Sequence, residues 1–345
     1  ADASEAIQLV ALSASVVFDV TDTANSIIVA GGTVMNQARN ITITLDISAQ
    51  QAEILYGYSN SGTTSYSIND LYSNIVGSGI EAGVFSAAQQ VIATGVDGDI
   101  AADDTSVVDY FYLASGASLT ATVDQHAKIL LASGTTSLTM ADSGIFTAKR
   151  SVEEYQFFSG DDTVTMSTKD ADYSMDLTSG GQDTLVVYDM THQAEDNKGL
   201  SVSGFSTGVG EDVIDLRLGN QSGGVSSSSY HQVDSGAQAV VVGNHSTLTL
   251  FEVSQAVVSP TDLLDVSDGG AVETALAAAL GAVTNSGGRD AAVILYGSGA
   301  SANQSALYSV RLQDGADAVS GNMDVDWIAT FDQVVADSFV YSNVI

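Results

Sequence analysis

A six-residue unit of the form Gly-x-Asp-x-apolar-x recurs in this chain and limits the folds that it can adopt. The unit reads GDDTVT at residues 160–165, GQDTLV at 181–186 and GEDVID at 210–215. An imperfect copy, GTTSLT at 134–139, has Thr where Asp would stand, and the four copies start 26, 21 and 29 residues apart. A period of roughly 20 to 30 residues is typical of one coil of a stacked β-solenoid.

The residue types of this unit indicate separate roles. Glycine permits a tight turn with positive φ, and the apolar residue points into the core because side chains alternate along a strand. The Asp offers a carboxylate to a cation held between successive turns, so Asp162, Asp183 and Asp212 are predicted Ca²⁺ ligands. Four acidic neighbours extend this predicted calcium site: Asp161, Asp189, Glu211 and Asp215. The alternative is that these are turn residues, since Asp after Gly is common in solvated loops.

The large negative charge of the chain limits the classes of partner that it can bind. Asp and Glu total 42 against 9 Lys and Arg, which gives a formal net charge of -33. Such a surface repels nucleic acid and anionic membranes, and it repels itself unless cations neutralise it. Calcium fits best because it takes carboxylate and carbonyl oxygens. The competing interpretation is a surface that only keeps the protein soluble.

Three further features bear on compartment and chemistry. Cysteine is absent, which excludes disulfides, thiolate metal sites and a cysteine nucleophile. No run of about 20 apolar residues occurs, so no transmembrane helix or membrane insertion is expected. The first residues do not resemble a signal peptide, so either a signal peptide has been removed or export depends on a signal elsewhere in the chain.

Short runs rich in Val, Ile, Thr and Tyr alternate with Gly, Ser, Asn and Asp, and this pattern predicts a mainly β fold in two regions. Residues 1–225 are expected to form a β-rich, partly parallel β-solenoid or β-roll-like body with short helices at 48–56 and 81–93. Residues 226–345 are expected to form a smaller β-rich α+β domain, which contains the clearest predicted helix at 271–284. Its predicted strands cover residues 292–296, 306–310 and 327–331.

The repeated units resemble degenerate halves of the repeat-in-toxin nonapeptide, whose parallel β-roll binds calcium. LSVSGF at 200–205, followed by GEDVIDL at 210–216, is similar to the segment that follows such repeats in type I secreted proteins. Residues 306–345 are similar to C-terminal domains of large bacterial surface proteins of that class. The resemblance covers about residues 150–345. It implies bound Ca²⁺, an extracellular or cell-surface location, and an uncleaved C-terminal export signal.

Catalytic motifs are not evident in the sequence, and we expect no enzymatic activity. The four histidines are scattered, and no Gly-x-Ser-x-Gly elbow, P-loop or dinucleotide fingerprint occurs. The first hypothesis is therefore a structural protein that self-assembles with calcium into a surface layer, filament or matrix. Its partner would be further copies of the same chain. If strand exchange links those copies, the stretch at residues 14–20 is a candidate donor.

Two alternatives remain open at this point. One is a calcium-stabilised adhesin or binding module that recognises a cell-surface glycan. The other is a parallel β-helix polysaccharide lyase or epimerase. That enzyme would need a basic groove for its polyanionic substrate, whereas the basic residues are few and spread from Arg39 to Arg311.

Overall fold

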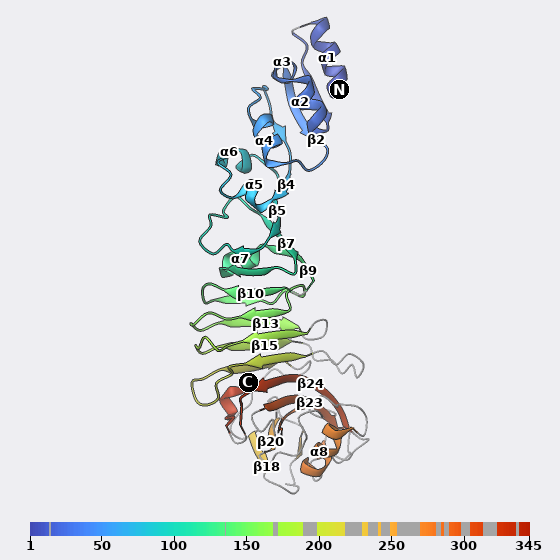
Figure 1. Ribbon diagram of the computed structural model, residues 1–345. Helices are drawn as coiled ribbons and strands as arrows, with labels where there is room; N and C mark the ends of the chain where they lie inside the picture. The colour runs from blue at the N-terminus through green and yellow to red at the C-terminus, as the bar shows by residue number, and fades with distance from the viewer. Residues whose placement is uncertain are drawn as a thin grey trace. The chain divides into compact units, whose positions relative to one another are not determined.

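Figure 1 shows the computed structural model of the chain. It describes residues 1–13, 15–134, 136–167, 172–188, 199–217, 230–233, 241–242, 249–253, 270–280, 284–285, 290–297, 304–312, 323–335 and 338–345. The chain divides into two compact units. Unit 1 comprises Ala1–Thr120 and Asp124–Thr136, and unit 2 comprises Ala121–Val123 and Ser137–Ile345. The boundary predicted between residues 225 and 226 lies outside the described residues and stays a prediction.

Unit 1 combines short helices with short parallel strands. Its elements are α1 (Ala3–Leu12), β1 (Phe18–Asp22), α2 (Ala24–Ala30), α3 (Gly32–Met35), β2 (Ala38–Ile43), α4 (Ala49–Tyr56), β3 (Thr64–Ser65), β4 (Ile68–Leu71), α5 (Tyr72–Ile75), α6 (Ala82–Ser86), β5 (Val91–Val96), β6 (Gly98–Asp99), β7 (Tyr110–Ser115), β8 (Ser118–Ala121), α7 (Val123–Ala127) and β9 (Ile129–Ser133). Most of the strands form parallel sheets in the orders β1-β2-β3 and β4-β5-β7-β9, and β6 pairs in parallel with β8. Helices α1, α2 and α3 lie beside β1 and β2 (Figure 1).

The helices of unit 1 begin where local capping favours them. The predicted helix at 48–56 is confirmed as α4, in which Ser48 caps the first turn and forms a capping box with Gln51. The helix predicted at 81–93 is wrong beyond its first half, because α6 ends at Ser86 and β5 begins at Val91. Here the backbone of Gln90 accepts a hydrogen bond from the sheet residue Ile68, so tertiary pairing overrides the helical periodicity.

Unit 2 consists mainly of strands. Its elements are β10 (Ser137–Met140), β11 (Ile145–Thr147), β12 (Glu154–Gln156), β13 (Thr163–Ser167), β14 (Tyr173–Asp176), β15 (Thr184–Tyr188), β16 (Leu200–Ser203), β17 (Val213–Arg217), β18 (Tyr230–Val233), β19 (Val241–Val242), β20 (Thr249–Val253), α8 (Ala271–Leu280), β21 (Thr284–Asn285), β22 (Asp290–Tyr296), β23 (Gln304–Leu312), β24 (Met323–Asp332) and the 3-10 turn η3 (Tyr341–Asn343). The prediction of a mainly β chain with parallel pairing is therefore confirmed.

Strands β10 to β17 alternate between two parallel sheets as the chain proceeds. The even-numbered strands pair in the order β10-β12-β14-β16, and the odd-numbered strands pair in the order β11-β13-β15-β17. Figure 1 shows β13 and β15 running side by side. The chain thus returns to the same sheet after every second strand, and we call each passage through both sheets a coil.

Each of these two sheets contributes one column of buried side chains to the core. The first column runs along the even-numbered strands and the second along the odd-numbered strands. The first comprises Leu138, Tyr155, Met175 and Val202, and the second comprises Phe146, Val164, Leu185 and Ile214. The columns meet where the rings of Phe146 and Tyr155 stack with centroids 5.9 Å apart. Apolar burial between the sheets therefore holds successive coils together.

The imperfect copy of the repeat does not take the place of the other three. Its residues Ser137 to Thr139 lie in β10 and pair with β12, whereas the three Asp-containing copies lead into β13, β15 and β17. The residue that stands in register before Asp162 is Gly144, because Thr163 N donates to Gly144 O at 2.9 Å. The equivalence predicted at residues 134–139 is therefore wrong, since a match at two positions, Gly134 and Leu138, cannot distinguish the two sheets.

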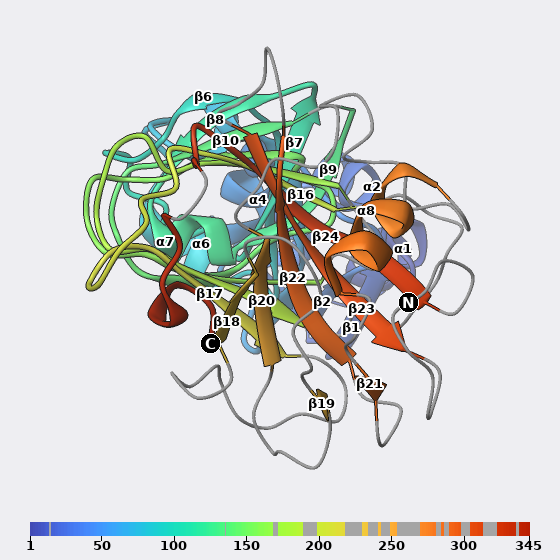
Figure 2. The ribbon, with the colours of Figure 1, turned by 90° about the horizontal axis from the view of Figure 1, so that it is seen from below.

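The remaining strands of unit 2 extend the even-numbered sheet. Beyond β16 the order is β24, β23, β22, β20 and β18, with antiparallel pairs between β22, β23 and β24. Figure 2 shows α8 beside this part of the sheet, and Val272 and Leu276 of α8 belong to one buried cluster with Val293 and Tyr308. The helix predicted at 271–284 is confirmed to Leu280, residues 281–283 lie outside the described ranges, and Thr284 belongs to β21.

Candidate functional site

Three aspartates of the repeated unit form a ladder between coils of unit 2. Each one directly precedes a strand of the odd-numbered sheet, and its Oδ1 accepts a hydrogen bond from a backbone N–H of the previous coil. Asp162 accepts from Gly144 N at 2.6 Å, Asp183 from Asp162 N at 2.9 Å, and Asp212 from Asp183 N at 2.8 Å. We call Asp162, Asp183 and Asp212 the aspartate ladder. It joins coils 18, 21 and 29 residues apart in sequence.

The glycine of the unit allows the coils to approach closely at the ladder. Gly181 has φ +134°, and a Cβ on it would lie 2.4 Å from Gly160 O. A Cβ on Gly160 would lie 2.1 Å from Ser143 Oγ. A side chain at Gly181 would meet backbone and therefore push the neighbouring coil away, which would lengthen the hydrogen bonds of the ladder, whereas at Gly160 a rotation of the Ser143 side chain relieves the closest contact.

The ladder carboxylates are buried, and two of their oxygens have no hydrogen-bond donor. Asp162 and Asp183 are each 1% exposed, and Oδ2 of each is buried without a hydrogen-bond partner. Asp212 differs because its Oδ2 accepts from Ser206 N at 2.7 Å. A buried carboxylate oxygen without a donor is costly, so this part of the ladder favours a proton or a cation beside it.

Burial alters the acidity of all three ladder groups. Loss of hydration raises the pKa of Asp183 to about 7, the N–H of Asp162 opposes that rise, and the charges of Asp212, Asp162 and Asp161 add to it. Burial also raises the pKa of Asp162 against the opposing effects of the Gly144 and Phe158 N–H groups, although the Phe158 N–H does not meet hydrogen-bond geometry with Oδ2. The pKa of Asp212 is raised in the same way, by burial first. Each carboxyl group of the aspartate ladder is therefore harder to ionise than an exposed aspartate.

Of the other predicted calcium ligands, the three that the structure describes lie at or near the surface. Asp161 is exposed and accepts from Gln182 N at 2.9 Å, Glu211 is exposed, and Asp215 is half-buried and pairs with Arg217 at 2.6 Å. Asp189 lies outside the described residues. Within the described ranges, three or more His, Asp or Glu side chains nowhere gather closely enough to hold one metal ion. The structure thus brings Asp162 and Asp183 together on successive coils and leaves the flanking acids at the surface.

In unit 1, three more aspartates accept hydrogen bonds from backbone N–H groups about 20 residues earlier in the chain, and the repeat pattern did not reveal them. Asp22 Oδ2 accepts from Ala3 N at 3.1 Å, Asp70 Oδ2 accepts from Ala49 N at 2.9 Å, and Asp109 Oδ2 accepts from Val91 N at 2.7 Å. Asp22 and Asp70 come at or near the end of a strand and reach the first residue of a helix in the previous coil. In the sequence, Asp22 and Asp70 could have been recognised because each stands at or near the end of a strand, just before a helix begins.

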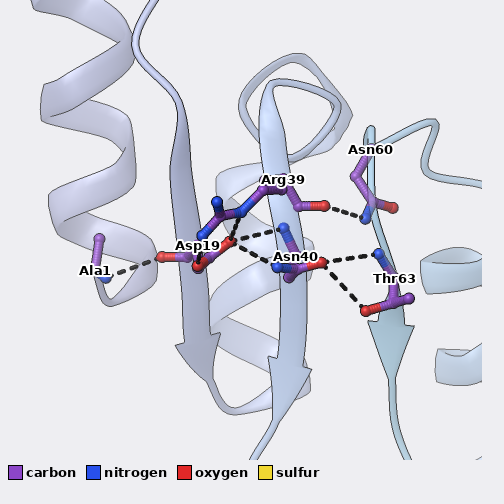
Figure 3. Close-up of polar contacts among 6 residues, drawn as sticks. All are labelled: Ala1, Asp19, Arg39, Asn40, Asn60 and Thr63. Atoms are coloured by element: carbon purple, nitrogen blue, oxygen red, sulfur yellow. Dashed lines mark hydrogen bonds and ion pairs between the residues drawn. The ribbon is translucent and has the colours of Figure 1, made fainter.

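A second polar ladder follows the start of the strands β1, β2 and β3. Asp19 binds Arg39 and accepts from Asn40 N and Nδ2, while Asn40 Oδ1 accepts from Thr63 N at 3.1 Å (Figure 3). The Arg39 guanidinium lowers the pKa of Asp19 to about 2. Both partners of this ion pair are more than two-fifths exposed, so the pair itself contributes little to stability and its strength falls with salt.

Replacing Asp70 by Ala tests the ladder of unit 1. The substitution removes the acceptor of Ala49 N, Leu71 N and Asn74 Nδ2, so we expect the free energy of unfolding to fall by about 1–2 kcal/mol. Chemical denaturation followed by circular dichroism measures the change. Asp46→Ala, at an exposed position one coil earlier, is the control and should stay within about 0.5 kcal/mol of the parent protein. Equal effects of the two substitutions would contradict the role of Asp70.

The geometry of the ladder is suited to binding charge and to joining coils. Its carboxylates accept backbone N–H groups with one oxygen and leave a second buried oxygen at Asp162 and at Asp183 for a proton or a hard cation. None of the helices in the described part of the chain combines the length and apolar character needed to cross a bilayer. No protein-family model, curated protein or solved structure matches this chain.

Proposed function

We propose that this chain is an extracellular structural protein that self-assembles, with calcium, into a surface layer, filament or matrix. We further infer that its body is a parallel β-solenoid. The alternation of β10 to β17 between two parallel sheets supports that inference, because each pair of strands then makes one coil. The proposed role requires no catalysis. It depends on stacked coils and on control of a large negative charge.

The observation that carries the proposal is the pair of buried, donor-free carboxylate oxygens on Asp162 and Asp183. Both belong to a chain with net charge -33, and they stand on successive coils. A Ca²⁺ ion beside them would replace the missing donors and neutralise both charges. Calcium takes 6–8 oxygen ligands, so backbone carbonyls, water and the nearby Asp161 would complete its shell. The residues present thus fit part of a calcium site.

Calcium would act on assembly through the same charge. Copies of a strongly acidic chain repel one another at low ionic strength, and bound cations reduce that repulsion. Binding to the folded state alone also stabilises it by mass action. A single ion class would therefore both tighten the coils and allow copies to approach.

The extracellular location rests on a different argument. The units around the ladder resemble repeat-in-toxin sequences, and the end of the chain is similar to domains of type I secreted surface proteins. Calcium is abundant outside cells, where weak extracellular sites are occupied. We therefore propose secretion by a type I pathway and a place at the cell surface.

Light scattering and negative-stain microscopy test this function. The protein is measured in chelator, in millimolar magnesium and in millimolar calcium at constant ionic strength. We expect ordered sheets or fibres in calcium only, together with a rise in the temperature of unfolding. The double substitution Asp162→Asn with Asp183→Asn should abolish the calcium response, whereas the exposed control Asp46→Asn should keep it.

Each other outcome points to a different conclusion. A monomer that calcium stabilises without assembly would overturn the structural role and support the calcium-stabilised adhesin, whose partner would be a cell-surface glycan. No change of size or stability in calcium would remove the metal from the proposal. Release of unsaturated products from an acidic polysaccharide would instead identify a lyase.

A further inference from the structure

The last residues of the chain add a strand to the odd-numbered sheet of unit 2. Val344 pairs in parallel with Ile214 of β17. Ile345 N donates to Ile214 O at 2.8 Å, and Leu216 N donates to Ile345 O at 2.7 Å. We call residues 338–345 the tail and the surface that residues 205–217 present to it the tail groove. The tail continues the order β11-β13-β15-β17 by one parallel rung.

Side chains of the tail fit specific positions in the groove. Asn343 is 0% exposed; its Oδ1 accepts from Gly208 N at 3.0 Å, and its Nδ2 donates to Gly208 O at 3.1 Å and to Asp212 O at 2.8 Å. Phe339 is buried against Phe205, with ring centroids 5.7 Å apart. Backbone pairing combined with pockets for particular side chains is how sheets recognise added strands.

The tail is separable from the rest of unit 2. Its contacts with Gly208 and Asp212 span more than 130 residues of sequence, so they do not depend on local turns. Between β24 and the tail, Gln333 has φ 69°, and it is the one non-glycine residue with positive φ in the described part of the chain. A left-handed backbone at a non-glycine residue costs conformational energy, so the connection to the tail begins at a strained position.

The tail also carries no charged side chain. Its sequence, SFVYSNVI, can approach another acidic copy without the repulsion that other parts of the surface would meet. The groove in turn needs an occupant, because the Gly208 N–H and the Asp212 carbonyl lose a buried hydrogen-bond partner when the tail leaves. A second copy of this chain supplies a strand with the same side chains at the same spacing.

We propose that the tail groove binds the tail of a second copy of this chain in place of its own, and that this exchange links copies during assembly. The inference rests on the proposed self-assembly and names the contact that produces it. Each copy gives one strand and accepts one; where a copy gives its strand to one neighbour and accepts from another, the contact is heterologous and can extend along a filament or layer. The predicted donor at residues 14–20 stays a separate prediction; its residues 18–20 pair with β2 in the same chain.

Engineered cysteines test the exchange directly, because the chain has none of its own. Asp215 and Ile345 are adjacent across the β17–tail pair, since Ile345 hydrogen-bonds to the residues on both sides of Asp215. Neither is fully buried, and paired strand positions lie within the Cα separation that a disulfide needs. One copy carries Asp215→Cys and another carries Ile345→Cys. The two are mixed, assembled in calcium and oxidised mildly.

We expect a disulfide-linked heterodimer on a non-reducing gel. The matched control replaces Asp215→Cys by Thr147→Cys, an exposed position on β11 of the same sheet, and should give about tenfold less heterodimer. Assembled material without the heterodimer would overturn the exchange and leave self-assembly standing. A mixture that never assembles in calcium would count against the proposed function itself.

A single chain with both cysteines gives a second, independent measurement. Oxidising the monomer in chelator should lock the tail in its own groove, and the locked protein should fail to assemble until it is reduced. Because the locked chain keeps its folded structure, circular dichroism separates this result from misfolding. Assembly of the locked protein at the rate of the parent would rule out the exchange.

Discussion

Asp183→Asn is expected to raise the free energy of unfolding by about 2–4 kcal/mol at about pH 8 in the presence of a chelator. The ionised Asp183 side chain is 1% exposed and stands between the acidic residues Asp162 and Asp212 of the ladder. Asparagine keeps an oxygen for the Asp162 N–H and removes the charge. The gain should disappear in the acid range, where Asp183 takes up a proton. Urea denaturation at about pH 8 and pH 5 measures both values.

The pH dependence of the parent protein follows from the same group. The pKa of Asp183 rises from 3.8 to about 7 on folding, so the folded state binds the proton more tightly than the unfolded state does. The stability from this proton is complete below about pH 4 and is lost as pH rises through about 7. Asp19, with a pKa of about 2, acts in the opposite sense and loses its contribution as pH falls through that value. Without calcium, stability should therefore be greatest in the mildly acidic range.

Calcium should reduce the difference in stability between the parent and Asp183→Asn. The ion stabilises the ionised pair of Asp162 and Asp183, so the parent should gain more from calcium than Asp183→Asn does. Asp46→Asn, an exposed change of the same chemistry, should follow the parent at every pH. If Asp183→Asn lowers stability at about pH 8 in chelator, the charge is stabilised by something other than a proton or a metal.

Asn343→Ala should cost about 3–5 kcal/mol of unfolding free energy. The side chain is fully buried and accepts from two N–H groups, those of Gly208 and Val340. It also donates to the carbonyl oxygens of Gly208 and Asp212. Alanine leaves these backbone groups of the tail groove without partners. Thermal and urea unfolding of the full chain measure the loss.

Two control variants separate the hydrogen bonds from the packing of the tail. Asn343→Asp keeps the size and the acceptor, but it places a carboxylate against the carbonyl oxygens of Gly208 and Asp212, so it should destabilise at least as much as alanine. Tyr341→Ser, at a side chain that is 45% exposed, should change stability by less than about 1 kcal/mol. A tolerated Asn343→Asp would show that the tail is not held by the amide of Asn343.

Local patterns were sufficient for the elements whose stability is local. The helix at α4 was predictable because Ser48 and Gln51 close a capping box within one turn. The strands β22, β23 and β24 were predictable because runs of β-branched and aromatic residues favour extended backbone wherever they pair. The recurrence of Gly-x-Asp correctly marked Asp162, Asp183 and Asp212 as equivalent positions, since each precedes a strand of one sheet.

The sequence did not show which groups Asp162, Asp183 and Asp212 contact, because those contacts form only when the coils stack. The spacing of the unit is the same whether the carboxylate faces solvent or a backbone N–H about 20 residues away, and only the registers of β13, β15 and β17 distinguish the two. The pairing of β10 with β12 separated Gly134 from the three repeats, and only the folded arrangement of unit 1 showed the similar contacts of Asp22 and Asp70. Residue order thus determined the β class and the equivalent positions. Burial between coils, which depends on long-range pairing, determined their chemistry.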